Sequence, residues 1–315
     1  MNYNYNSGYG QGMLASAVTP TLSGKVRIVG KAGLANRDMI TQVFGPDPDG
    51  KLRYFSTIEA AINTCTANAG DVVYVLPGHT EAVTATSLNV DVAGVTIKGL
   101  GSGSLKPTLT FAATDSTVNV TAANCTFQNL RVQAAVGDVV TAFLHATAAQ
   151  NTQYLDIEFY ATSTFNFINC YTLGAANISD GCRWERNYLR TADAGQLALC
   201  VTAAAQNDLK FYNNYVAHAA AAAGLLTAGA VNLLGLDVRG NFVQTAQSDG
   251  SVGVFVITTS TASQGCIVDN DFKTADAAAN VAIPIASKVY AARNYVAGAD
   301  EVGTVIAVGT LFDNS

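Results

Sequence analysis

The sequence predicts an all-β fold, a right-handed parallel β-helix of about nine coils. The first indication is a recurring marker, most often Asn between apolar residues, spaced by 30, 29, 29, 27, 27, 29 and 24 residues from Gly99 onward. The second is an apolar, β-prone run that follows most markers roughly ten residues later. The third is that the links between these short runs lack a helical pattern. Coils of 24 to 30 residues that stack on one another satisfy all three observations.

The markers are expected to form one corner column of the coils. Asn tolerates the left-handed backbone that a sharp corner needs, and its side-chain amide can bond to the amide one coil away. We therefore predict an asparagine ladder, with Gly99 and Glu158 in register with it. The predicted members of the ladder are Asn129, Asn187, Asn214, Asn241, Asn270 and Asn294.

The chain is expected to divide into three segments. Residues 1–45 form an extended N-terminal arm, residues 46–70 a linker and an amphipathic cap helix, and residues 71–315 the parallel β-helix. The cap helix is indicated by an apolar stripe that includes Phe55, Ile58 and Ile62, opened by a capping box from Ser56 to Glu59. A helix in this position covers the open end of the first coil.

Composition excludes several classes of function. Seventeen basic residues against 23 acidic residues give a net charge of −6, which argues against nucleic-acid binding. The sequence has no apolar run long enough for a membrane helix and no signal-peptide pattern at its N-terminus. The six cysteines form no CxxC pair, and we expect free, buried thiols in a protein made in a reducing cytoplasm.

The segment FSTIEAAINTCTANAGDVVYVLPGHTEAV, residues 55–83, resembles the entrance of the pectin-lyase-like superfamily of right-handed parallel β-helices. In that superfamily a cap helix leads through a Gly-Asp turn into a strand that ends in Pro-Gly. The superfamily includes many phage tailspikes and other virion proteins, and the resemblance points to this branch. It implies the fold over residues 54–315, with His79 in a turn or at the surface.

The sequence indicates no catalytic, cofactor or metal site. The four motifs of the polygalacturonase-type hydrolases are absent, and the acidic residues are scattered singly, unlike those that hold calcium in the lyases of the superfamily. The strongest catalytic candidates are Asp193, Asp276 and Asp300, each six residues after its marker. Acids in polar turns explain them better, because the intervening coils carry Ala220 and Gln247 at this position. Neither His145 nor His218 has an evident partner nearby in the sequence.

The first 20 residues are expected to be an attachment device. This polar, aromatic, low-complexity segment has too little apolar mass to fold alone. Large side chains with few rotatable bonds are suited to anchor such a segment on a partner. The residues expected to bind the partner are Tyr3, Tyr5, Tyr9, Met13 and Leu14.

These observations favour a non-enzymatic virion structural protein of a tailed phage, a capsid decoration, cement or fibre subunit assembled in the host cytoplasm. Its expected partners are other virion proteins, the major capsid protein first among them, together with a host-surface glycan and copies of itself in a homotrimer. Whether the unit is a monomer or a trimer stays open. The alternatives are a tailspike-type enzyme that degrades polysaccharide and a glycan-binding β-helix without catalysis.

Overall fold

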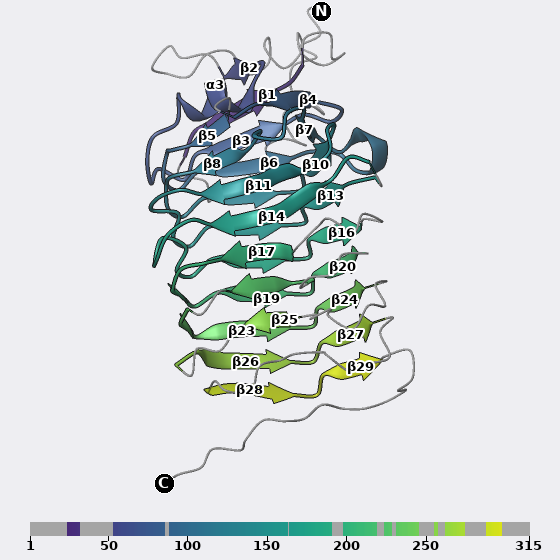
Figure 1. Ribbon diagram of the computed structural model, residues 1–315. Helices are drawn as coiled ribbons and strands as arrows, with labels where there is room; N and C mark the ends of the chain where they lie inside the picture. Colours follow the sequence, from purple (N-terminus) through teal and green to yellow (C-terminus); the bar gives the residue numbers. More distant parts are fainter. Residues whose placement is uncertain are drawn as a thin grey trace, which may run out of the picture.

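The chain folds as a parallel β-helix whose coils stack along one axis (Figure 1). Three parallel sheets, here called A, B and C, form its sides. The computed structural model describes residues 24–31, 53–85, 88–162, 164–190, 198–218, 224–228, 231–245, 255–257, 262–274 and 288–297.

Every sheet neighbour in the described residues is parallel, and a strand pairs with its equivalent one coil away. Sheet A contains β1 (Val26–Val29), β2 (Tyr54–Phe55), β3 (Val72–Val75), β6 (Thr96–Gly99), β9 (Thr126–Gln128), β12 (Gln153–Leu155), β15 (Arg183–Glu185), β19 (Lys210–Tyr212), β23 (Leu236–Arg239), β26 (Gln264–Val268) and β28 (Lys288–Ala292). Sheet B contains β4 (Thr80–Val83), β7 (Thr108–Phe111), β10 (Arg131–Ala134), β13 (Glu158–Tyr160), β16 (Tyr188–Arg190), β20 (Tyr215–His218), β24 (Phe242–Thr245), β27 (Asp271–Thr274) and β29 (Tyr295–Ala297). Sheet C contains β5 (Leu88–Val90), β8 (Val118–Val120), β11 (Val139–His145), β14 (Phe167–Leu173), β17 (Ala198–Thr202), β21 (Leu226–Ala228) and β25 (Phe255–Ile257). A further pair, β18 (Gln206–Asn207) and β22 (Leu233–Leu234), and a 3-10 turn, η2 (Gly103–Leu105), complete the described elements beside the cap helix.

The predicted fold class is confirmed, with a smaller number of coils. A complete coil needs one strand from each sheet, and sheet C contributes seven strands to the described residues. About seven complete coils are therefore present, rather than the nine expected from the markers. The expectation was higher because it counted coils from the recurring markers along the chain, and not from complete sets of three strands.

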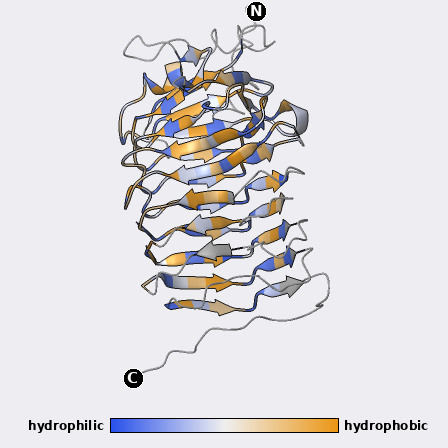
Figure 2. Cartoon of the chain, viewed as in Figure 1, coloured by the Kyte–Doolittle hydropathy of each residue, from blue (hydrophilic) through white to orange (hydrophobic). Residues whose placement is uncertain are grey.

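The core consists of side chains that point inward from all three sheets. Four rings stack in one column of sheet A, with centroid separations of 5.1, 6.0 and 4.7 Å along the series Phe127, Tyr154, Trp184 and Phe211. Hydrophobic residues recur in the strands of successive coils (Figure 2). Because equivalent strands are about 4.8 Å apart, side chains of one column pack directly on each other.

The cap helix α3 (Ile58–Ile62) covers the first coil, with Ile58, Ala61 and Ile62 buried. Its N-cap is Thr57, whose side chain accepts a hydrogen bond from the Ala60 N–H, so the cap lies one residue after the predicted Ser56. The carboxylate of Glu81 in β4 accepts the Ile58 N–H at 2.9 Å. A negative charge at a helix N-terminus stabilises it.

His79 closes the turn at Pro77-Gly78, as expected, with its N–H donating to the Leu76 oxygen at 3.1 Å. It is not at the surface, since only 2% of it is exposed. Its Nε2 lies 3.1 Å from the Glu81 carboxylate that caps α3. His79 therefore supports the joint between the cap helix and the first coil, in the interior of the molecule.

The expected boundary of the arm at residue 45 is too late. Strand β1 lies within residues 1–45 and pairs in parallel with both β2 and β3 of sheet A. Its sequence, VRIV, is rich in β-branched residues, and Ile28 and Val29 are buried. Residues 1–23, which contain Tyr3, Tyr5, Tyr9, Met13 and Leu14, lie outside the described residues.

Five of the six predicted ladder residues lie in one column. In each step the side-chain oxygen of one Asn accepts both the backbone N–H and the side-chain amide of the Asn one coil before it, as Asn241 does from Asn214 at 2.9 Å each. All five are buried. They are Asn187, Asn214, Asn241, Asn270 and Asn294.

Asn129 and Glu158 do not belong to this column. Arg131, Glu158 and Tyr188 are in register on neighbouring strands. The residues just before them, Leu130 and Ile157, are therefore in register with Asn187 and occupy the ladder position in their coils. The left-handed residue of each corner precedes the ladder position by one, with φ between 52° and 65°. These residues are Asn129, Asp156, Arg186, Asn213, Gly240, Asp269 and Arg293.

Candidate active site

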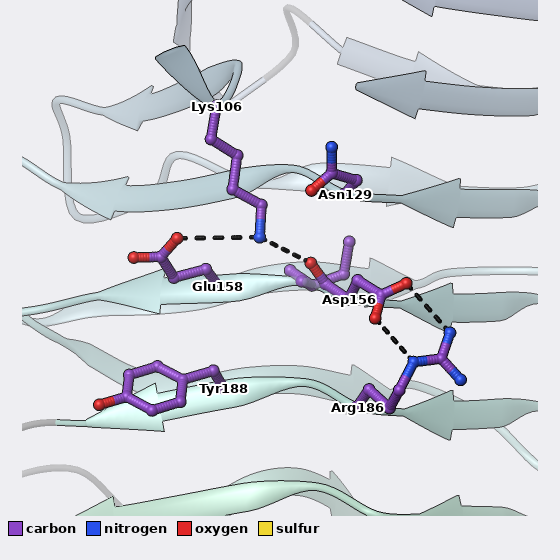
Figure 3. Close-up of a pocket in the computed structure, with 7 residues that line it drawn as sticks. Lys106, Asn129, Asp156, Glu158, Arg186 and Tyr188 are labelled. Carbon is purple, nitrogen blue, oxygen red and sulfur yellow. Dashed lines mark hydrogen bonds and ion pairs between the residues drawn. The ribbon is translucent and has the colours of Figure 1, made fainter. Parts of the chain in front are cut away.

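The described residues form an open cleft at the corner between sheets A and B, with a volume of about 620 Å³. One end of β13 and one end of β16 meet there, and the segment after η2 overhangs them (Figure 3). The cleft is lined by Lys106, Asn129, Asp156, Ile157, Glu158, Arg186 and Tyr188.

The back of the cleft is an ion pair between two left-handed corner residues of adjacent coils. Arg186 Nε and Nη2 donate to the two carboxylate oxygens of Asp156 at 2.8 and 3.0 Å. These hydrogen bonds lower the pKa of Asp156 and raise that of Arg186. Arg186 also contacts the Glu185 carboxylate, which Arg183 contacts in turn. Asp156 is therefore ionised at neutral pH, and both of its carboxylate oxygens accept hydrogen bonds from Arg186.

Lys106 forms the roof of the cleft. Its Nζ donates to the backbone oxygen of Asp156 at 2.9 Å and lies 3.7 Å from Oε2 of Glu158. Burial lowers the pKa of Lys106, and the charges of Glu158 and Asp156 oppose that effect. Lys106 is a cation held at short range from two acidic residues, at the inner side of an open cleft.

Asn129 and Arg131 hold the loop that carries Lys106. The Asn129 side-chain amide donates to the backbone oxygens of Gly99 and Gly101 at 2.9 and 3.0 Å. Arg131 Nη2 donates to the backbone oxygen of Gly103 at 3.2 Å. A Cβ at Gly99 would lie 2.1 Å from the Asn129 oxygen, so only glycine permits this close approach.

Glu158 is the carboxylate at the open side of the cleft. Arg131 Nη2 donates to its two oxygens at 3.1 and 3.3 Å, from the neighbouring strand of sheet B. About a quarter of the Glu158 side chain, 26%, is exposed. Of the two carboxylates that line the cleft, Glu158 has the looser contacts, because the pair of bonds from Arg186 fixes Asp156.

Tyr188 closes the cleft from the side of the next coil. It pairs in register with Glu158, and its side chain is 40% exposed. Figure 3 shows the ring on the strand next to that of Glu158, on the opposite side from Lys106. The cleft thus has a charged roof and back and an aromatic floor.

The catalytic candidates of the sequence do not form this site. Asp193, Asp276 and Asp300 lie outside the described residues. His145 is fully buried, its two ring nitrogens each 2.7 Å from a hydroxyl, those of Ser179 and Tyr154. Burial lowers the pKa of His145 to about 3. It is a neutral core residue that no substrate can reach.

Sequence reasoning missed Lys106, Asp156, Arg186 and Tyr188. A search for paired carboxylates restricted to Asp-Asp and Asp-x-Asp passes over Asp156-Ile157-Glu158. Lys106 carries no local signal, because it reaches Glu158 across 52 residues of chain through the stacking of coils.

Within the described part of the chain, no group of three His, Cys, Asp or Glu residues is placed to hold a metal ion. No helix of that part has the length and apolar character needed to cross a membrane. The six cysteines are free; four are buried, and Cys65 and Cys266 are half-buried.

No protein-family model matches the sequence, and no curated protein does. Among solved structures, a pectin methylesterase variant in complex with a hexasaccharide has 13% identity and a TM-score of 0.49, over 89% of this chain and 91% of that one. A pectin methylesterase from Aspergillus niger has 14% identity and a TM-score of 0.41, over 85% of this chain and 90% of that one.

This finding corrects the expectation of a non-enzymatic virion protein of a tailed phage, the class to which a capsid decoration or fibre subunit belongs. Both solved structures are enzymes, and neither is a virion protein. The resemblance to the pectin-lyase-like superfamily holds at the level of the fold, and the phage branch is not supported. The expectation of a non-enzymatic protein was wrong because the absence of known catalytic motifs excludes only the enzyme families that carry those motifs. The chain is similar in fold to pectin methylesterases, which are right-handed parallel β-helix proteins.

Proposed function

We propose that this protein is a carbohydrate esterase, an enzyme that hydrolyses an ester group carried by a polysaccharide. The observation that carries the proposal is the pairing of Glu158 with Lys106 at 3.7 Å in an open cleft with an aromatic floor. A carboxylate can take a proton from water, and an ammonium ion can stabilise the negative charge that develops on a carbonyl oxygen.

Two features favour ester hydrolysis over cleavage of a glycosidic bond. Glycosidic cleavage uses two carboxyl groups, one on either side of the bond, and Arg186 already holds both oxygens of Asp156, the second carboxylate of the cleft. An ester carbonyl needs its base and its oxyanion donor both within about 3 Å of the reacting atoms. Glu158 and Lys106 are close enough for that arrangement.

In the proposed reaction, Glu158 takes a proton from a water molecule whose oxygen attacks the ester carbonyl carbon. The carbonyl oxygen becomes negatively charged beside the Lys106 ammonium. When the carbon–oxygen bond to the alcohol breaks, Glu158 returns the proton to the departing oxygen. The products are an acid and an alcohol, and both side chains regain their starting protonation state.

Asp156 and Arg186 position this pair. Asp156 presents its backbone oxygen to Lys106 Nζ, and its carboxylate is held by Arg186. Arg131 holds Glu158 from the other side. The site therefore needs no rearrangement to place the base and the oxyanion donor together.

The test uses purified protein and a panel of esterified polysaccharides: methyl-esterified pectin, acetylated xylan and acetylated alginate. We expect release of methanol or acetate without new reducing ends, and loss of that release in the Glu158→Gln variant. Absence of release from every member of the panel, or new reducing ends with the ester groups intact, would overturn the proposal.

A further inference from the structure

A stack of three rings runs along the outer face of sheet B and ends at the cleft. Tyr188, Tyr215 and Phe242 are in register on β16, β20 and β24. Their ring centroids are 4.9 and 4.8 Å apart, with interplanar angles of 9° and 5°. The separation equals the spacing of neighbouring strands, so the backbone itself holds the rings parallel.

The two ends of this ring stack differ. At the end away from the cleft, the Lys273 ammonium lies 4.7 Å from the centroid of Phe242 and covers that ring. At the cleft end, the next residue in register is Glu158, whose carboxylate is held by Arg131 and Lys106. Tyr188 is consequently the end ring of the stack, packed on Tyr215 at one face and bordering the cleft.

The floor and the walls of the cleft suit one kind of ligand. The ring of Tyr188 offers an apolar, flat surface, whereas Lys106, Asp156, Glu158 and Arg186 offer charged hydrogen-bonding groups around it. A pyranose has the same division, with C–H groups on a ring face and hydroxyl groups at its edge. A base of a nucleic acid would also stack, but the phosphates of the nucleic-acid backbone would meet two carboxylates on a chain with a net charge of −6.

We infer that a pyranose ring of the substrate packs on the part of the Tyr188 ring that lines the cleft, beside Glu158. The inference rests on the proposed function, since it places the sugar that carries the ester. Stacking on a ring that the sheet holds rigid fixes the plane of the sugar, and the ester group at its edge is then directed toward Lys106 and Glu158. Tyr188 is a binding residue in this assignment and takes no part in proton transfer.

Tyr295 offers a matched control. It belongs to the same outward column of sheet B, through Asp271, and is 42% exposed, close to the 40% of Tyr188. It does not line the cleft. Removing the Tyr295 ring takes a comparable exposed aromatic from the same face without touching the inferred sugar site.

The experiment measures binding and turnover separately. Binding of short oligosaccharides prepared from the three polysaccharides is followed by calorimetry in the Glu158→Gln background, and KM and kcat are measured with Glu158 intact. Tyr188→Ala should weaken binding about ten-fold and raise KM by a similar factor, since an aromatic contact contributes on the order of the free energy of one tenfold step. Tyr188→Phe keeps the ring and should weaken binding less than Tyr188→Ala, and Tyr295→Ala should stay within about two-fold of the parent.

Unchanged binding in Tyr188→Ala, an equal loss in Tyr295→Ala, or no binding of any oligosaccharide would overturn the inference. Tighter binding of a single-stranded oligonucleotide than of every oligosaccharide would overturn it in favour of a nucleobase. The two proposals fail separately. If the enzyme turns over and its KM is unchanged in Tyr188→Ala, only the inference that a sugar packs on Tyr188 is rejected. If oligosaccharides bind in a Tyr188-dependent way but no ester is hydrolysed, only the proposed esterase activity is rejected.

Discussion

Two corners of the β-helix, four coils apart, carry nearly the same residues and differ in what surrounds them. In the first, Arg186 pairs with Asp156, and in the second Arg293 pairs with Asp269 at 2.6 and 2.8 Å. Two residues further along each strand stand Glu158 and Tyr188 in the first corner and Asp271 and Tyr295 in the second.

The corner ion pair is therefore a feature of the coil, and it does not by itself make a site. What distinguishes the first corner is the loop that brings Lys106 over it, held by Asn129 and Arg131. In the second corner the carboxylate of Asp271 pairs with Lys273 of its own strand at 3.3 Å. The candidate site arises where the loop that carries Lys106 places an ammonium group beside the repeated corner ion pair.

The largest expected difference between the corners is catalytic. Glu158→Gln should lower the rate of ester hydrolysis by roughly 10²- to 10⁴-fold, because the amide cannot take a proton from water. The counterpart Asp271→Asn should keep the full rate. Initial rates of acid or alcohol release from the polysaccharide panel measure both, and equal rates in the two variants would contradict the assignment of the base.

Lys106 should account for the second largest effect. Lys106→Met should lower the rate by about 10²- to 10³-fold through loss of the oxyanion donor, and Lys273→Met should not. Lys106 acts while protonated and burial lowers its pKa, so the wild-type rate should fall as pH rises through that lowered value. Lys106→Arg keeps its charge to higher pH, so its rate should lack this alkaline fall. An unchanged alkaline limb in the pH–rate profile of Lys106→Arg would assign the limb to another group.

The two corners also differ in how much the residue at the ladder position contributes to the free energy of unfolding. That position is occupied by Ile157 in the first corner and by Asn270 in the second, which accepts from Asn241 and donates to the Val238 and Val268 oxygens. Asn270→Leu leaves these buried groups without partners and should lower the free energy of unfolding by about 1–3 kcal/mol. Urea unfolding measures the change. Ile157→Leu, which alters no hydrogen bond, should cost less, and a larger loss in Ile157→Leu would speak against the ladder as the stronger element.

The smallest expected effect is the pH dependence of the two ion pairs. Arg186 and Arg293 lower the pKa of Asp156 and Asp269 below the ordinary 3.8. Each pair therefore stabilises the fold above that value, and the contribution is lost as pH falls through the lowered pKa of the folded state. Asp156→Asn should reduce the melting temperature slightly at neutral pH and not in strong acid. A difference that persists in strong acid would mean that the substitution acts through packing.

The sequence predicts the fold well because the fold is periodic. Intervals of 24 to 30 residues between markers reveal coils, and an Asn in the marker position is explained by the ladder that Asn187 to Asn294 form. The offset at Asn129 and Glu158 escapes such reasoning, because a shift of one residue barely changes an interval of 29. Cys266 was expected to be buried like the other cysteines, yet it lies in register with Asp237 and is only half-buried, whereas Cys125 and Cys182 are fully buried.

The candidate site was not predictable in the same way. Asp156 and Arg186 read as turn residues of the repeat, and only stacking shows that they pair. Lys106 lies outside the repeat pattern, and its contact with Glu158 depends on the path of the loop after Gly99. The repeat pattern in the sequence shows the features that all coils have in common. The candidate site depends on Lys106, which the other coils lack.

The most direct test of the account is a crystal structure of the Glu158→Gln protein soaked with a methyl-esterified or acetylated oligosaccharide. We predict a sugar ring on Tyr188 and an ester carbonyl oxygen beside Nζ of Lys106, with the corner of Asp271 and Tyr295 empty. An oligosaccharide bound at the Asp271 corner, or one bound in the cleft with its ester group turned away from Lys106, would contradict the central claim that the loop bearing Lys106 makes the first corner an active site.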